Sequence, residues 1–176
     1  MDTSSSPVLA ESPAVTSQLS SDQAILVIHN PVAGWWQRNK LRAYLKELRK
    51  AGRRVIVRKT TGPGDATFIA AEVDPRQVET VVAAGGDGTI REVADGLAGS
   101  GVRLAVLPLG TANILALELG LGLNPRAAAR ATAHANEGTG FAGLVDNRRF
   151  LLMVSAGIDA RVVSRTSSKI KRYVGK

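Results

Sequence analysis

Thr80-Val-Val-Ala-Ala-Gly-Gly-Asp-Gly-Thr89 leads from an apolar run directly into a glycine-rich turn. The residues that follow, Ile90, Val93 and Leu97, recur at the spacing of a helix. The segment therefore predicts a strand, a tight turn and the start of a helix, a geometry that presents unpaired backbone N–H groups to an anion such as phosphate. Because a carboxylate would repel phosphate, Asp87 indicates bound Mg²⁺ or a polar contact that depends on charge.

The composition predicts one α/β domain. The chain has 176 residues, enough for one such domain and few for two. It has no cysteine, which excludes disulfides and thiolate metal sites. No apolar run reaches the roughly 18 residues that a transmembrane helix needs. Residues 1–22 are rich in Ser, Thr and Pro and lack the features of a signal peptide, so we expect a disordered tail and a cytoplasmic protein.

Strand and helix patterns alternate over the first 120 residues, and one more helix pattern follows. The expected strands are apolar runs at Ala24–His29, Val55–Val57, 79–84 and Leu104–Leu107. The expected helices carry apolar stripes and cover about 38–51, a segment N-capped by Asp65, 89–98, about 112–120 and 125–136. This alternation predicts an α/β fold, a three-layer parallel sheet flanked by helices, over residues 23–137.

The pattern changes after residue 138. Val145-Asp146-Asn147-Arg148 and the apolar residues that follow predict a hairpin with Asp146-Asn147 near its turn. We expect residues 138–176 to be the beginning of a β-rich second lobe that is incomplete in this chain.

Turn-forming and polar residues follow each of the expected strands. These segments are Asn30-Pro31, Thr60-Thr61, Gly85–Thr89 and Pro108–Asn113. The carboxyl ends of parallel strands lie at one edge of a sheet, where ligands of α/β proteins bind. We therefore expect these segments to meet, although they are far apart in the sequence.

The ordered set of motifs resembles the diacylglycerol kinase catalytic domain family, which includes bacterial lipid kinases and sphingosine kinases. The resemblance covers about residues 24 to 165. It rests on Asn30-Pro31-x-x-Gly34, Thr60 with Gly64-Asp65-Ala66, Gly85–Thr89 with Glu92, Pro108-Leu-Gly-Thr-Ala-Asn113, and Gly157-Ile-Asp159-Ala160.

The resemblance implies an ATP-dependent, Mg²⁺-assisted kinase that phosphorylates a lipid hydroxyl. Asp87 and Asp159 would be catalytic, with Asp87 also the metal ligand and Asp159 facing the acceptor hydroxyl. The residues expected to bind ATP are Asn30, Pro31, Thr60, Gly85, Gly86, Asp87, Gly88, Thr89, Glu92, Gly110, Thr111 and Asn113. Relatives continue into a larger second lobe, so we expect this chain to be truncated after the N-terminal lobe.

Other interpretations stay open at this point. Glu92 has the position of an ordinary first-turn acid, and Asp159 that of a turn or cap residue. A related fold would give a NAD kinase or a sugar kinase, which share the phosphate loop. A chain of this length is also consistent with a non-catalytic nucleotide-binding fragment.

The formal net charge of +8 favours anionic partners. Residues 161–176 carry six Lys or Arg and no acid, the pattern of a basic amphipathic helix on an anionic membrane or of a helix that packs on a further lobe. We expect peripheral contact with the inner membrane face through these residues, and a homodimer as one candidate assembly. No aromatic platform accompanies the charge, so nucleic acid is not expected as a partner.

Overall fold

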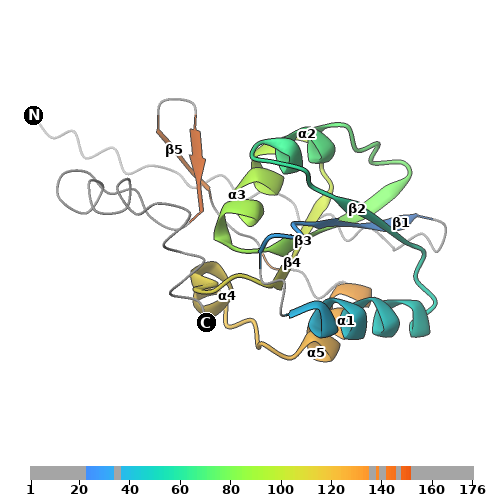
Figure 1. Cartoon of the computed structure of the whole chain (residues 1–176). Coiled ribbons are helices and arrows are strands. Elements are labelled where there is room, and N and C mark those ends of the chain that lie inside the picture. The colour runs from blue at the N-terminus through green and yellow to red at the C-terminus, as the bar shows by residue number, and fades with distance from the viewer. Residues whose placement is uncertain (1–22, 34–36, 135–137, 139–141, 146–147, 152–176) are drawn as a thin grey trace, which may run out of the picture.

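A parallel sheet of four strands forms the centre of the fold (Figure 1). The computed structural model describes residues 23–33, 37–134, 138, 142–145 and 148–151. The strands are β1 (Ala24–His29), β2 (Val55–Lys59), β3 (Val78–Gly85) and β4 (Arg103–Pro108), in the order β2-β1-β3-β4. Every pair is parallel, which confirms the predicted sheet.

Helices cover both faces of this sheet. They are α1 (Arg38–Lys50), α2 (Asp65–Ala71), α3 (Asp87–Gly96), α4 (Ile114–Glu118) and α5 (Pro125–Ala133). α2 and α3 pack on one face, and α1 and α5 pack on the other (Figure 1). The predicted three-layer arrangement is confirmed. Among the described residues, no helix is long and apolar enough to cross a membrane.

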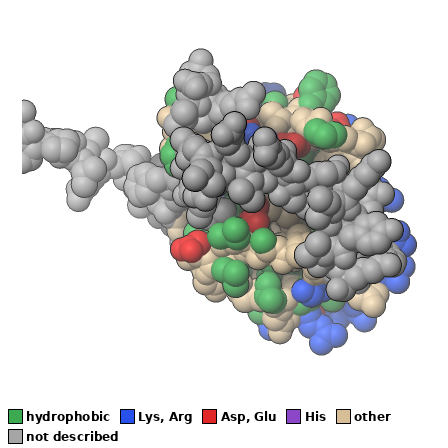
Figure 2. Space-filling view, turned by 60° about the vertical axis from the view of Figure 1, so that its left-hand side comes forward, with side chains coloured by type: hydrophobic (Ala, Val, Ile, Leu, Met, Phe, Trp, Pro, Cys, Tyr) green, Lys and Arg blue, Asp and Glu red, His purple; other side chains and the backbone are tan. Residues whose placement is uncertain are grey.

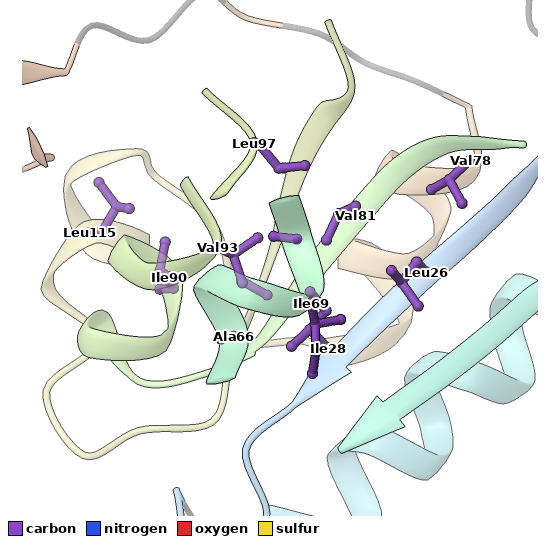
Figure 3. Packing of buried hydrophobic residues seen from close by; sticks show 12 residues of the cluster. Leu26, Ile28, Ala66, Ile69, Val78, Val81, Ile90, Val93, Leu97 and Leu115 are labelled. Atoms are coloured by element: carbon purple, nitrogen blue, oxygen red, sulfur yellow. The ribbon is translucent and has the colours of Figure 1, made fainter. Parts of the chain in front are cut away.

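The alternation of side chains along β1 divides the core in two. Leu26 and Ile28 point toward α2 and α3, whose buried Ile69, Ile90 and Val93 complete one cluster (Figure 3). Ile25 and Val27 point toward α1 and α5. The predicted apolar stripes of α1 and α2 are confirmed, because Tyr44 and Leu48 are buried in one cluster and Ala66 and Ile69 in the other.

The hydroxyl of Tyr44 joins the two helices of the second layer. It lies 2.7 Å from Oγ1 of Thr132 in α5. Thr132 donates its own hydrogen to the carbonyl of Ala128, so Tyr44 is the donor in this pair. Burial raises the pKa of Tyr44 to about 12.

The beginnings of three helices differ from the expectation. α3 begins at Asp87, two residues earlier than expected. Asp65 is not the N-cap of α2, because Gly64 occupies that position with a left-handed φ of 82°. The carboxylate of Asp65 instead accepts hydrogen bonds from the backbone N–H and the hydroxyl of Thr61, at 2.7 and 3.1 Å. α4 is shorter than expected because Asn113 adopts a left-handed conformation and delays the helix to Ile114.

A second, small sheet follows the α/β layers. β5 (Gly143–Val145) and β6 (Arg148–Phe150) pair in antiparallel fashion, as the hairpin prediction requires. The turn residues Asp146-Asn147 and the segments 1–22 and 152–176 lie outside the described residues. The disordered tail and the second lobe over 138–176 therefore stay predictions.

A buried ion cluster joins three strands at the amino edge of the sheet. Glu79 of β3 pairs with Arg53, just before β2, and with Arg103 of β4, whose Nη2 lies 3.2 Å from its Oε2. The Glu79 side chain is only 4% exposed. A charge taken out of water is tolerated only when it is paired, so these contacts depend on one another.

Replacing Gly96 by Ala should destabilise the fold by about 1–3 kcal/mol, because α2 and α3 approach each other here without space for a methyl group. A Cβ on Gly96 would overlap the carbonyl oxygen of Thr67 and lie 2.7 Å from Cβ of Ala70. Urea unfolding measures the effect. Gly88→Ala, in the same helix but with nothing within 4 Å of its Cβ, is the matched control. Equal stability of the two variants would contradict the packing argument.

Candidate functional site

A cleft of about 430 Å³ opens at the carboxyl edge of the sheet, between the loops after β1 and β2 and the first turns of α2 and α3. It is the place that the order of parallel strands predicts for a ligand. Its lining consists of Asn30, Pro31, Val32, Ala33, Thr60, Thr61, Gly62, Pro63, Ala66, Gly86, Gly88, Thr89 and Glu92.

The structure brings together most of the predicted binding residues. Those that line the cleft are Asn30, Pro31, Thr60, Gly86, Gly88, Thr89 and Glu92. Gly85 is buried behind Thr89, while Asp87 and the segment from Gly110 to Asn113 lie next to Gly86 but are not part of the lining. Asp159 lies outside the described residues, so its role stays a prediction.

Asn30 organises the loop after β1. Its Oδ1 accepts hydrogen bonds from the backbone N–H groups of Val32 and Ala33, at 3.0 and 3.3 Å. Its Nδ2 donates to Oγ1 of Thr89 at 3.2 Å. One amide side chain therefore fixes the loop and joins it to the first turn of α3.

The glycines of the turn differ in what surrounds them. A Cβ on Gly85 would lie 2.6 Å from Cβ of Thr89, so only glycine allows Thr89 to fold back over the end of β3. Gly88 is exposed and lines the cleft, and a Cβ at this position would meet nothing within 4 Å. Gly85 is thus required by the close packing of Thr89, while Gly88 leaves space for a ligand in the cleft.

The loop after β4 lies directly against the glycine turn. A Cβ on Gly110 would lie 2.6 Å from Cα of Gly86, so the two backbones are in contact. Asn113 accepts a hydrogen bond from the N–H of Gly110 and donates one to its carbonyl, both at 2.8 Å. Gln37, at the start of α1, donates weakly to the carbonyls of Leu109 and Gly110.

Asp87 connects the glycine turn to α4. Its Oδ2 accepts a hydrogen bond from the N–H of Ile114 at 3.2 Å, and its Oδ1 accepts one from Leu115 at 3.1 Å. These are N–H groups of the first turn of a helix, which lack partners within the helix. Asp87 therefore makes a polar contact, and its partners are the backbone N–H groups of α4.

The charges near the cleft are unevenly placed. Glu92 is the charged side chain of the described lining. On the α1 side of the same edge lie Arg38, Lys59 and the half-buried His29. Burial, followed by the positive charges of Lys59 and Arg38, lowers the pKa of His29 below its ordinary value.

Some residues of this edge were not predicted from the sequence. Val32, Ala33, Gly62 and Pro63 line the cleft, and Gln37 braces the loop after β4. The sequence could have placed the turn Gly62-Pro63 in the cleft, because this turn directly follows the polar end of a strand. Gln37 carried none, since its partners are more than 70 residues away.

A metal ion would find few protein ligands in the part of the chain that the structure describes. These residues contain no group of three or more His, Asp or Glu side chains that could hold a metal ion. Mg²⁺ often takes only one or two protein carboxylates and completes its shell with substrate phosphates and water. Glu92, in the cleft, fits a ligand of that kind.

Fold and site together define a class of protein: an α/β lobe with a glycine-turn cleft at the carboxyl edge of a parallel sheet. Residues 24–142 match the family model of the diacylglycerol kinase catalytic domain. The chain belongs to this family, which confirms the resemblance drawn from its motifs.

Individual relatives agree with this assignment. The chain is 40% identical over 159 residues to a probable lipid kinase YegS-like of Pseudomonas aeruginosa, covering 89% of this chain and 51% of that protein. A protein of the same description from Pseudomonas putida is 36% identical over 155 residues, covering 87% of this chain and 51% of the relative.

Solved structures show the same fold. A putative diacylglycerol kinase from Bacillus anthracis str. Sterne superposes with a TM-score of 0.66 at 28% identity, over 82% of this chain and 52% of that chain. The chain thus spans about half the length of the relatives that it matches.

Asp87→Asn should lower the free energy of unfolding by about 1–3 kcal/mol, because the amide offers one acceptor oxygen where the carboxylate offers two, and sets its NH₂ group against a backbone N–H. Chemical denaturation measures the loss. Asp95→Asn, in the same helix, is the control, since its carboxylate pairs with the exposed side chain of Arg91. Equal losses in the two variants would show that the contact with α4 contributes nothing.

His29 should make the fold less stable in mild acid. Its pKa is lowered in the folded chain, so the unfolded chain binds the proton more readily. The contribution of neutral His29 to the stability of the fold is complete above the ordinary pKa of 6.5 and is lost as the pH falls below it. We expect His29→Gln to reduce the fall in unfolding free energy between about pH 7 and pH 5. His134→Gln, at an exposed position, is the control. If the unfolding free energy of His29→Gln falls with pH as steeply as that of the unmodified chain, His29 is not the group responsible.

Proposed function

We propose that this chain is the nucleotide-binding lobe of an ATP-dependent, Mg²⁺-assisted lipid kinase. The observation that carries the proposal is the cleft, where Asn30 and Thr60, which follow two different strands, meet Gly88 in the first turn of α3. Membership of the diacylglycerol kinase catalytic domain family supports the choice of reaction.

The cleft suits the phosphates of ATP. The first turn of α3 supplies backbone N–H groups and the positive end of the helix dipole, and Gly88 allows close approach. The hydroxyls of Thr60 and Thr89 are further donors. The carboxylate of Asp87 accepts N–H groups of α4, which moderates the repulsion that a free carboxylate would exert on phosphate.

The role of Mg²⁺ is to offset the charge on the phosphate oxygens during transfer. Glu92 would hold the ion from the cleft side. Asp87 was predicted as the metal ligand, and in this proposal it acts first by fixing α4 and the loop before it. Thr111, exposed at that loop, would reach the nucleotide from the other side of Gly86.

The acceptor in this proposal is a lipid hydroxyl, with Asp159 receiving its proton. Contact of residues 161–176 with the inner membrane face, and a homodimer, belong to the same proposal. Transfer to NAD or a sugar is the rival within the enzymes of related fold.

A second candidate, nucleotide binding without transfer, is favoured by one observation. Among the described residues, the lining of the cleft contains the single carboxylate of Glu92. In that case the chain would bind ATP and transfer nothing.

Gly88→Asp should weaken binding of Mg²⁺–ATP at least tenfold, because it places a negative charge on the floor of the cleft. The fold should persist, since nothing lies within 4 Å of the added Cβ and an acid in the first turn of a helix is favourable. Calorimetry measures the affinity. Gly122→Asp makes the same change at a remote position with equal space and should bind like the unmodified chain. Unchanged affinity in Gly88→Asp would refute the proposed phosphate site.

Labelled ATP distinguishes the candidate functions. The chain is offered diacylglycerol, phosphatidylglycerol, a sugar and NAD as acceptors. Label in a lipid supports the proposed reaction, and label only in NAD overturns the lipid assignment. Binding of ATP with no labelled product supports the second candidate.

A further inference from the structure

One face of α1 consists almost entirely of cations. At 100° per residue, Arg38, Arg42, Lys46, Arg49 and Lys50 fall within roughly 120° of the helix circumference. All five are exposed, and the half-buried Leu45, which packs against the core, lies at the border of this sector. The opposite side of the helix holds the buried Tyr44 and Leu48. We call these five cations the basic face of α1.

No acidic side chain of α1 offsets this charge. Glu47, the acid of this helix, lies on its flank and pairs with Arg130 of α5 at 3.2 Å. None of the ion pairs found among the described residues involves the basic face. Figure 2 shows Lys and Arg side chains gathered along one side of the molecule. Five unneutralised cations on one helix face repel each other, which an anionic partner would relieve.

The basic face reaches the edge of the sheet that carries the cleft. α1 begins at Arg38, near the carboxyl end of β1, where Lys59 pairs in register with His29. The positive charges of Arg38 and Lys59 both act on His29, so both cations lie near the carboxyl end of β1. The charged surface therefore runs from this edge along the whole of α1.

We propose that the basic face of α1 docks this protein on an anionic lipid bilayer. Each basic residue near such a surface adds to binding, and five on one helix form an extended row that a bilayer contacts at once. The choice of a bilayer rests on the proposed function, since a lipid kinase must reach an acceptor there.

Nucleic acid is the competing anionic partner. Single strands are bound through aromatic side chains interleaved with the charge, and the outer face of α1 has none, because Tyr44 is buried. The cations of α1 also do not belong to a known motif that enters a groove of duplex DNA. The observations therefore favour the bilayer.

The test is cosedimentation of the full chain with vesicles of phosphatidylcholine, with or without an equal part of phosphatidylglycerol. We expect binding only when phosphatidylglycerol is present, and weaker binding as salt is added. Arg42→Glu with Lys46→Glu should weaken binding at least roughly tenfold. Arg76→Glu with Arg91→Glu, at exposed positions away from α1, makes the same charge change, from +8 to +4, and should bind nearly as the unmodified chain. Circular dichroism confirms that each variant is folded.

Other outcomes overturn the proposal. Equal loss in both double variants would show a response to net charge and not to this face. Full binding by the α1 variant, or no binding by the unmodified chain, would remove α1 as a docking surface. A duplex oligonucleotide that displaces the chain from vesicles at lower concentration than added lipid would make nucleic acid the partner. ATP affinity, measured on the same samples, separates failure of this inference from failure of the nucleotide site.

Discussion

The contact between Gly86 and Gly110 is the constraint on which the site depends. It brings the carboxyl ends of β3 and β4 so close that a methyl group on Gly110 would meet Cα of Gly86 at 2.6 Å. Around this contact, Asn113 closes its own loop on Gly110, and Asp87 holds the first N–H groups of α4. A side chain on Gly110 would separate these loops, and Asp87 would then lose its partners.

The sheet and its helices could be predicted because their signals are local. β1 and β3 are continuous apolar runs, and α1 repeats Leu41, Tyr44, Leu45 and Leu48 at helical spacing, so pattern alone indicates buried strands and a core-facing helix. The rule that parallel strands end at one edge then places Asn30, Thr60 and Gly88 in one cleft, as the structure does.

The exact partners could not be predicted, because they depend on contacts between distant segments. Asp87 and Ile114 are 27 positions apart, and no spacing rule connects a carboxylate in one loop to the backbone of another. The position of Asp65 in the sequence is that of an N-cap. In the structure Gly64 is the N-cap in a left-handed conformation, and the carboxylate of Asp65 accepts a hydrogen bond from the N–H of Thr61. A residue type shows what a side chain is able to bind, and the fold decides what lies within its reach.

The two edges of the sheet are held together by different forces. At the amino edge, the buried carboxylate of Glu79 pairs with Arg53 and Arg103, an arrangement that would be costly to open because it would leave an unpaired charge out of water. At the carboxyl edge, the contacts are hydrogen bonds to backbone groups, several of them partly exposed. Breaking one such bond at a partly exposed site costs less than leaving a buried charge without a partner.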